Sequence, residues 1–212
     1  MTELIATPDP RHELPFFGLQ LLRSTHPQLR RLRKTLPKTT HHGNKLWKSS
    51  AILLDYLSEF PLPQATRVLE VGAGWGLGGI YCAKYFAVAV MALDIDPAVF
   101  PILELQAAHN GVLIKPHIAR FENLTEQYLA EFDVMIASDI CFWDEASEPV
   151  YNLLCLAQKV GLRVIVSDPG RPPFIEVVEN LPEHFDYAFE NWSVPHPYNY
   201  SGLVLDIPAR AL

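Results

Sequence analysis

Between residues 67 and 166, short runs of valine, isoleucine and leucine alternate with longer segments in which apolar residues recur every three or four positions. The short runs are apolar at nearly every position, which is typical of strands buried on both faces of a parallel sheet. We expect such strands at Arg67–Val71, Val88–Leu93, Val112–Ile118, Asp133–Ala137 and Leu162–Val166. The longer segments predict helices at Gly76–Phe86 and Tyr151–Val160 and a third between Asp96 and Asn110. This alternation predicts an α/β fold, in which helices cover both faces of a mostly parallel sheet.

The helix between the second and third strands carries signals at both ends. Asp96 is an N-cap acid followed by a proline at the first helical position, and Asn110-Gly111 is a typical helix end. Pro101 lies inside this helix, although proline lacks the N–H that an interior turn needs. We therefore expect the helix to begin later than Pro97 or to bend in its first turn.

Both ends of the chain depart from the alternation. The predicted elements there are a short helix between Pro27 and Pro37, a loop at residues 39–44, a longer helix at Leu46–Phe60, and a closing pair of strands at Phe185–Val194 and Tyr200–Ile207. The sequence thus predicts a helical extension over residues 1–45, packed as part of the same domain as the α/β core of residues 46–212.

Composition narrows the class of protein. A chain of 212 residues that is 49% hydrophobic is long enough to bury the core of one domain. Its three cysteines form no close pair, which argues against a disulfide framework, and no Cys/His spacing resembles a metal site. The apolar stretches are too short to span a bilayer, and the N-terminus lacks the pattern of a signal peptide. We therefore expect a soluble cytoplasmic protein without a metal or a membrane partner.

The charge is unevenly distributed. The net charge is −7, yet residues 1–50 contain nine lysines and arginines against three acidic residues. The basic run consists of Arg23, Arg30, Arg31, Arg33, Lys34 and Lys38. It is either a solvated helix face or a docking surface for an acidic partner, protein or nucleic acid.

A glycine-rich turn follows the first predicted strand. Gly72, Gly74 and Gly76 lack a Cβ, so the backbone can turn sharply and approach a ligand closely. The N–H groups of the following helix point at that ligand. Such a turn binds either the pyrophosphate of a dinucleotide or S-adenosylmethionine (SAM), and it can also be a structural turn without a ligand.

Three features favour SAM over a nicotinamide or flavin cofactor. Glu70 lies on the strand, two residues before the first glycine, and a helix precedes that strand. No second domain remains to bind a redox substrate. At the end of the second strand, Asp94 can accept hydrogen bonds from both ribose hydroxyls. Asp96 is the rival for this role, but its N-cap position already explains it.

These residues resemble a family. The segments Val68-Leu-Glu-Val-Gly-Ala-Gly-Trp-Gly-Leu, Ala92-Leu-Asp-Ile-Asp-Pro and Asn110-Gly-Val are similar to class I SAM-dependent methyltransferases. Two further stretches, Asp139-Ile-Cys-Phe142 and Asp168-Pro-Gly-Arg171, resemble methyltransferase family 16, as does the tryptophan-bearing segment from Leu46 to Ala51. That family contains many protein-lysine methyltransferases and a group of predicted nicotinamide N-methyltransferases.

The resemblance implies a Rossmann-like sandwich with a seven-stranded sheet, SAM as cofactor and S-adenosylhomocysteine as product. The cofactor-binding residues that we expect are Trp47, Glu70, Gly72, Ala73, Gly74, Gly76, Asp94, Ile95, Phe121 and Ser138. The segment Arg120-Phe121-Glu122 departs from the pattern expected at the adenine. Glu122 is therefore either the adenine-contacting acid or a surface glutamate.

The expected catalytic residues are Asp139 and Phe142, with Trp143 binding the substrate. Asp139 would orient an amine or take its proton through water, and the aromatic rings would favour a cationic amine. The alternatives are an N-cap role for Asp139 and core packing for Trp143. Asp168 is expected in a turn, with Arg171 a solvated loop charge unless the resemblance holds.

The expected activity is SAM-dependent methylation of a protein lysine. A small-molecule N-methyltransferase, an RNA methyltransferase and a non-catalytic SAM-binding protein are the alternatives. The fourth strand is not followed by the Asn/Asp-Pro-Pro-aromatic motif with which enzymes clamp a nucleobase or glutamine amine. No oligomeric state follows from the pattern.

Overall fold

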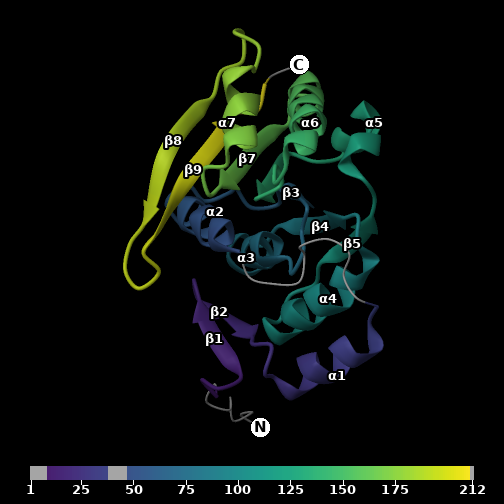
Figure 1. Ribbon diagram of the computed structural model, residues 1–212. Helices are drawn as coiled ribbons and strands as arrows, with labels where there is room; N and C mark the ends of the chain where they lie inside the picture. Colours follow the sequence, from purple (N-terminus) through teal and green to yellow (C-terminus); the bar gives the residue numbers. More distant parts are fainter. Residues whose placement is uncertain (1–8, 38–46, 211–212) are drawn as a thin grey trace.

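A twisted seven-stranded sheet runs through the middle of the computed structural model, which describes residues 9–37 and 47–210 (Figure 1). The strands are β3 (Arg67–Val71), β4 (Ala89–Asp94), β5 (Lys115–Ile118), β6 (Val134–Ser138), β7 (Arg163–Asp168), β8 (Ala188–Val194) and β9 (Tyr200–Ile207). Their order is β5-β4-β3-β6-β7-β9-β8; β9 pairs antiparallel with both β7 and β8, and the other neighbouring strands pair parallel. The five predicted parallel strands and the closing pair are confirmed.

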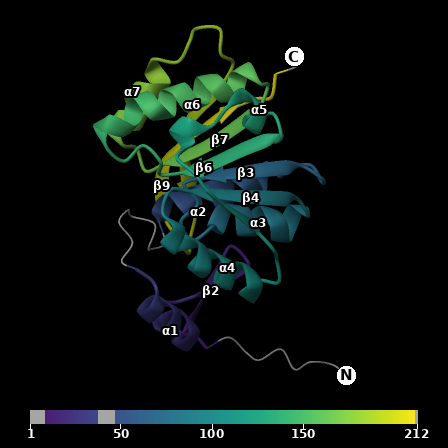
Figure 2. The ribbon, with the colours of Figure 1, turned by 90° about the vertical axis from the view of Figure 1, so that its right-hand side faces the viewer.

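Helices cover both faces of the sheet, as predicted. They are α2 (Lys48–Glu59), α3 (Leu77–Phe86) and α4 (Phe100–His109) on one face, and α5 (Glu126–Leu129), α6 (Ser147–Lys159) and α7 (Pro172–Glu179) on the other (Figure 2). Alternate residues of each strand point to opposite faces. In β3, Val68 therefore packs with α2 and α3, while Leu69 and Val71 pack with α6 and α7.

The edge strand β5 is shorter than predicted. It begins at Lys115, although the apolar run begins at Val112. Leu113 is 92% exposed, and most side chains of β5 are exposed as well. The apolar residues before Lys115 therefore join α4 to the sheet, because an edge strand needs fewer buried positions than a central one.

The start of α4 confirms the expectation for a proline inside this helix. A single 3-10 turn at Pro97–Val99 begins with Asp96, whose carboxylate accepts a 2.9 Å hydrogen bond from the Ala98 N–H. The α-helix begins only at Phe100, so that Pro101 lies in its first turn, where no hydrogen-bond donor is missing. The helix ends at Asn110 and Gly111, as predicted.

The N-terminal segment is only partly helical, which corrects the prediction of a helical extension. The predicted helix between two prolines is α1 (Pro27–Thr35), but an antiparallel hairpin of β1 (Glu13–Phe16) and β2 (Leu19–Leu22) precedes it. Phe17 and Gly18 both have positive φ, 49° and 75°, which is typical of a two-residue hairpin turn.

Side-chain amides of α4 complete the hairpin edge. Gln106 accepts from the Leu22 N–H at 2.9 Å and donates to the Leu22 carbonyl at 3.1 Å. Asn110 makes the same pair of bonds with the backbone of Gln20, at 2.9 Å each. Two amides thus replace a neighbouring strand, and the hairpin shares the core that α2, α3 and α4 bury. The domain boundary near residue 45 stays a prediction.

The connection between α1 and α2 was predicted as a loop at residues 39–44, which lie outside the described residues. The helix predicted at Leu46–Phe60 is α2, and Trp47 is its N-cap residue. Among the helices of the described residues, none is both long and apolar enough to cross a membrane.

Candidate active site

The polar residues that follow the strands meet at one edge of the sheet. A cavity of about 210 Å³ opens where β3, β4 and β6 end. The predicted site residues that line it are Trp47, Glu70, Gly72, Ala73, Gly74, Asp94, Ile95, Phe121, Ser138, Asp139, Phe142 and Trp143. This convergence is expected because the carboxyl ends of parallel strands lie at the same edge. The roles of these residues stay predictions.

Gly76 is the predicted cofactor residue that does not line the cavity. Its φ is +72°, and a Cβ there would lie 2.6 Å from the Leu103 Cγ atom. The missing side chain therefore allows the turn to pack against α4. Gly72 lies in the lining, and a Cβ on it would stand 2.8 Å from the Ile140 side chain.

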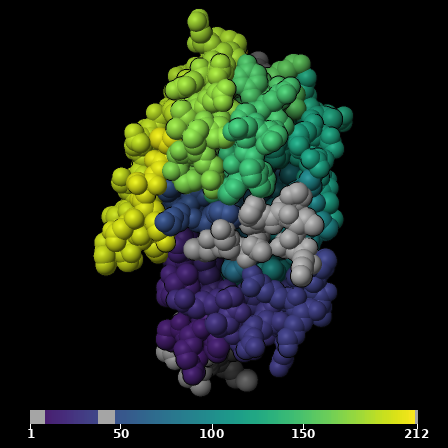
Figure 3. Space-filling model, in the orientation of Figure 1, coloured from purple at the N-terminus to yellow at the C-terminus, as the bar shows by residue number. Residues whose placement is uncertain are grey.

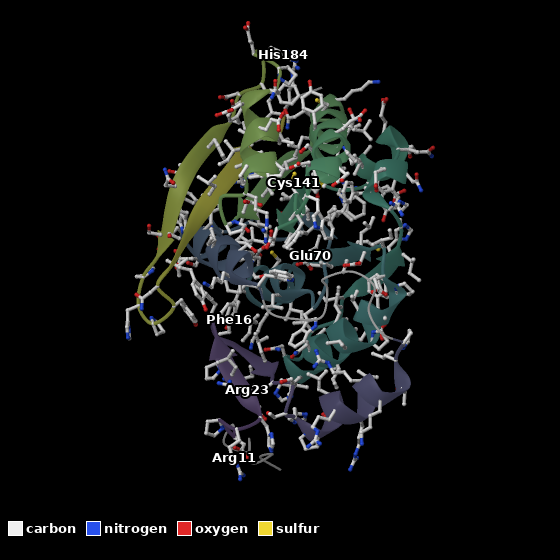
Figure 4. All side chains as sticks on the ribbon, in the orientation of Figure 1. Arg11, Phe16, Arg23, Glu70, Cys141 and His184 are labelled. Carbon is white, nitrogen blue, oxygen red and sulfur yellow. The ribbon has the colours of Figure 1, made fainter. Side chains whose placement is uncertain are left out.

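Glu70 is a buried carboxylate at the centre of the molecule (Figure 4). One of its oxygens accepts a 3.0 Å hydrogen bond from the Gly78 N–H. The other lies against Gly79, and the backbone N–H groups of Gly78 and Gly79 both act to lower the pKa of the carboxyl. Burial raises the pKa of Glu70 to about 8. A buried carboxylate on the wall of a cavity could hold the ammonium group of an amino-acid ligand.

Asp94 fixes the glycine turn from the neighbouring strand. One carboxylate oxygen accepts from the Gly74 N–H at 2.9 Å, and the other accepts from the Asp96 N–H at 2.9 Å. Burial raises the pKa of Asp94. Each oxygen keeps a further lone pair for a ligand hydroxyl. Asp96 does not line the cavity and caps the following turn, as expected.

Asp139 forms a bidentate ion pair with Arg171. The Arg171 Nε and Nη2 atoms donate to its two oxygens at 2.5 Å and 3.0 Å, and 4% of the Asp139 side chain is exposed. The alternative N-cap role is wrong, because no helix begins at Asp139, which has a positive φ of 60°. Arg171 was expected to be a solvated loop charge unless the family resemblance holds; its guanidinium carbon lies 3.8 Å from the centre of the Phe142 ring, so it is a partly buried part of the site.

Asp168 builds the turn that positions Arg171, as its place before a proline predicts. One of its oxygens accepts from the backbone N–H groups of Gly170, at 2.8 Å, and Arg171, at 2.6 Å. Burial raises the pKa of Asp168 to about 6. The Asp-Pro-Gly-Arg stretch was the sequence signal for this arrangement, but it did not reveal that Arg171 reaches Asp139.

Aromatic rings wall the open side of the cavity. The centre of the Phe142 ring lies 5.8 Å from that of Trp47 and 4.8 Å from that of Trp143. Trp143 is 49% exposed, so the alternative of core packing is wrong for it. These rings and the buried Asp139 line the same cavity, and the substrate role expected of Trp143 stays a prediction.

Two features of the lining were not predicted. The indole of Trp75, in the glycine turn, is 7% exposed and lines the cavity. Ser138 lies 3.0 Å from the hydroxyl of Ser167, which donates to the Ser49 carbonyl at 2.8 Å and so ties α2 to the strand ends. The pairing of serines far apart in the chain left no signal in the sequence.

A second cavity of about 250 Å³ adjoins the first beside Phe121 and Ile95. Glu122 lines it but does not line the first cavity. Its carboxylate is exposed and lies 3.5 Å from Arg120. Both expectations for Glu122, the adenine contact and the surface charge, therefore remain predictions.

Comparison with known proteins places this geometry in a family. A family model described as lysine methyltransferase matches residues 30–168. The electron transfer flavoprotein beta subunit lysine methyltransferase of Rattus norvegicus is 25% identical over 154 residues, covering 71% of this chain and 58% of the relative. Histidine protein methyltransferase 1 homolog of Dictyostelium discoideum is 27% identical over 124 residues, covering 56% of this chain and 40% of the relative. The matched part of the chain thus spans 58% of the length of the first relative and 40% of the length of the second.

Solved structures share the fold. TrmN from Thermus thermophilus has a TM-score of 0.60 at 17% identity, over 75% of this chain and 48% of that one. An rRNA methylase from Streptococcus thermophilus has a TM-score of 0.54 at 17% identity, over 74% of this chain and 93% of that one. Identities this low establish the architecture alone.

Proposed function

Because the chain belongs to the lysine methyltransferase family, we propose that it transfers a methyl group from SAM to the ε-amine of a lysine in a protein. Membership makes SAM the methyl donor, as the glycine turn predicts. The observation that carries the choice of acceptor is the entrance of the cavity, where a buried carboxylate, Asp139, stands beside the exposed ring of Trp143.

The lining residues fit SAM. Glu70 supplies a carboxylate for the ammonium of its methionine part, and Asp94 retains lone pairs for the ribose hydroxyls. When bound, SAM supplies an activated methyl group on a positively charged sulfur. The acidic lining therefore suits a cationic cofactor as well as a cationic amine.

Asp139 is suited to attract and orient the lysine. At pH 7.4 only about one free lysine amine in a thousand is neutral, so the substrate arrives as an ammonium ion. Arg171 occupies one acceptor position on each oxygen of Asp139, and each oxygen keeps another for the ammonium. This geometry favours orientation by Asp139 over direct proton abstraction, and the proton would leave through water.

Phe142 and Trp143 complete the lysine entrance. Aromatic faces attract cations and exclude water from the amine. Loss of hydration lowers the cost of removing the proton, because it disfavours the charged form. Holding the amine in line with the methyl group then supplies several kcal/mol of the barrier reduction.

The test identifies the acceptor directly. Purified protein and SAM with a labelled methyl group are incubated with a cell extract, and label is then followed into protein, RNA and small molecules. We expect label in protein, recovered as methyl-lysine after hydrolysis. Asp94→Ala is the control, because it should lose SAM binding. Label confined to RNA or small molecules, or recovered as methyl-histidine, would contradict the proposal.

A further inference from the structure

The helix α1 carries a cationic face without compensating acids. Its sequence from Pro27 to Thr35 contains four basic residues and no acidic one. Leu29 is buried in the core, whereas Arg30, Arg31 and Lys34 are exposed. Within residues 9–37 and 47–210, no ion pair joins any of these three side chains to a carboxylate. We call Arg30, Arg31 and Lys34 the basic face.

Folding explains only part of this charge. Lys34 and Arg33 lie in the last turn, where cations stabilise a helix by interacting with its dipole. Arg30 and Arg31 lie mid-helix, where that effect is weak. Arg30 and Lys34 are four positions apart, a spacing at which like charges destabilise a helix. Helix stability therefore does not account for Arg30 and Arg31, which is consistent with a role in binding a partner.

Other basic residues of the N-terminal segment are already used within the segment. Arg11 pairs with Asp9 at 2.7 Å, and Arg23 donates to the Glu13 carbonyl at 3.1 Å. Both lie along the hairpin, far from Glu70 in the centre of the molecule (Figure 4). Among the described residues of this segment, α1 carries four of the six basic side chains at positions 9–37.

The helix α1 leads to the cofactor cavity. At its start, the His26 ring lies 6.3 Å from His109, at the end of α4. At its last turn, the Arg33 guanidinium lies 5.6 Å from the centre of the Trp75 ring, and Trp75 lines the cavity. Figures 2 and 3 show α1 beside α4 and at the molecular surface. The helix that carries the basic face therefore reaches a residue of the cavity lining through Arg33.

Charge at the entrance is of the opposite sign. Asp144 and Glu145 are exposed next to Trp143, and residues 51–212 carry twenty-one acids against eight lysines and arginines. A nucleic acid seated on α1 would place its phosphates against this acidic surface. A protein that presents a lysine beside a cluster of acids would match both surfaces at once.

On the basis of the proposed function, we propose that the basic face of α1 docks an acidic stretch of the protein substrate, next to the lysine that is methylated. Arg30 and Arg31 bind its carboxylates, while the lysine enters past Trp143 toward Asp139. The substrate is thus recognised by a pattern of separated charges rather than by the lysine alone.

The test measures binding and transfer on the same probes. Two fluorescent peptides have one central lysine each; one has four glutamates on one flank and the other has four glutamines there. Anisotropy with the S-adenosylhomocysteine-loaded protein gives the affinity for each peptide. The test variant is Arg30→Glu/Arg31→Glu. The matched control is Lys115→Glu/Arg210→Glu, which changes the net charge equally at exposed positions outside the cavity lining.

We expect the glutamate peptide to bind more tightly than the glutamine peptide at low salt. The test variant should lose roughly tenfold in affinity for it, and added salt should reduce the difference. The control variant should bind the glutamate peptide with nearly the wild-type affinity. Both variants should also keep nearly the wild-type affinity for SAM. Equal binding of the two peptides, or an unchanged affinity in the test variant, would overturn the inference. The same anisotropy measurement is made with a fluorescent RNA oligonucleotide. If the test variant loses affinity for the RNA and keeps its affinity for the glutamate peptide, the inference is also overturned.

The two proposals fail in different ways. Binding that depends on Arg30 and Arg31, without methyl transfer to any lysine, would support the docking surface and contradict the proposed function. Lysine methylation at equal rates in the glutamate and glutamine peptides would support the proposed function and contradict the docking surface. Circular dichroism of the test variant shows whether α1 is retained, and Arg30→Gln/Arg31→Gln repeats the measurement without introduced acids.

Discussion

At the scale of single residues, the two acids that follow β4 have different tasks. Asp94 lies in the cavity and holds the Gly74 N–H, whereas Asp96 caps the turn at Pro97–Val99. Sequence alone favoured Asp94 for the ribose because a cap position explained Asp96. The structure agrees with the cap role, and the ribose contact stays a prediction.

Asp94→Ala should weaken SAM binding more than Asp96→Ala. A hydrogen bond to a charged acceptor is worth about 1.5–3 kcal/mol, so we expect a loss of at least about tenfold in affinity for the first variant. The second should cost about 1 kcal/mol of stability as a lost cap. Calorimetric titration with SAM and thermal unfolding of both variants check this. Equal affinities in two folded variants would contradict it.

Glu70 should make the stability of the ligand-free protein depend on pH. Burial raises its pKa to about 8 in the folded state, while an unfolded glutamate titrates near 4.3. Protonated Glu70 therefore stabilises the folded state relative to the ionised form. This contribution to the free energy of unfolding is complete below about pH 4.3, declines above that pH, and is lost as pH rises through 8. The slope reaches at most about 1.4 kcal/mol per pH unit.

The measurement is the free energy of unfolding by urea between pH 6 and 8, with Glu70→Gln as the comparison. The difference in stability between wild type and variant should shrink as pH falls. Saturating SAM should also reduce the dependence, because its ammonium would hold Glu70 charged. Parallel curves for the two proteins would show that Glu70 does not titrate in this range.

Arg171 should affect turnover rather than cofactor binding. Arg171→Met leaves Asp139 without its ion-pair partner and removes the cation from Phe142, so we expect turnover to fall by roughly tenfold or more. Arg171→Lys should retain part of the activity. Arg163→Met is the matched control, because Arg163 pairs with Asp206 at 2.6 Å and is equally exposed. The control should lose stability but keep its turnover; equal turnover losses would refute a positioning role.

At the scale of elements, the central sheet was predictable and the hairpin was not. Strands such as β3 and β6 are buried on both faces, so continuous apolar runs reveal them. The hairpin is held by Gln106 and Asn110, which lie more than eighty residues away in the chain. Local spacing carries no trace of that contact. The same reason hid the pairing of Asp139 with Arg171, while the strand ends themselves could be placed.

The amides of α4 should be required for the hairpin. Gln106→Ala leaves the buried N–H and carbonyl of Leu22 without partners, which should cost about 2–4 kcal/mol. Amide exchange at Leu22 should accelerate more than exchange in β3. Gln158→Ala, another buried glutamine that bonds to carbonyls of Leu162 and Pro208, is the control. Unchanged exchange at Leu22 would show that packing alone holds the hairpin.

At the scale of the whole molecule, the protein has an acidic cavity at the edge of the sheet and a basic helix, α1, in the N-terminal segment. The sheet edge collects acids from β3, β4 and β6 around one cavity, while α1 carries the opposite charge beside it. In the proposed function, the acidic lining suits cationic ligands in general, and the glycine turn and Glu70 are expected to contact the amino-acid part of SAM. The identity of the cofactor can therefore be tested by measuring which ligand stabilises the folded wild-type protein.

SAM and S-adenosylhomocysteine should raise the melting temperature, and NAD should not. Ligand at a hundred times its dissociation constant stabilises a protein by about 2.7 kcal/mol, or about 5–10 °C for a chain of this size. Differential scanning fluorimetry measures the shift, and Asp94→Ala should reduce it. A shift with NAD and none with either SAM species would refute the assigned cofactor.

The close approach of Glu70 to α3 constrains how this chain can diverge. A Cβ at Gly78 or Gly79 would lie within 2.8 Å of a Glu70 carboxylate oxygen. Alanine at either position would therefore displace the acid unless residue 70 became shorter at the same time, and at position 79 it would also meet the Val90 side chain at 2.8 Å. The three positions should covary among descendants of this sequence, so the inherited signature extends beyond the glycine turn and ends at Gly79. A homologue that keeps the glycine turn but has alanine at position 78 and a small residue at position 70 lacks the buried carboxylate. We expect its cavity to bind a different ligand.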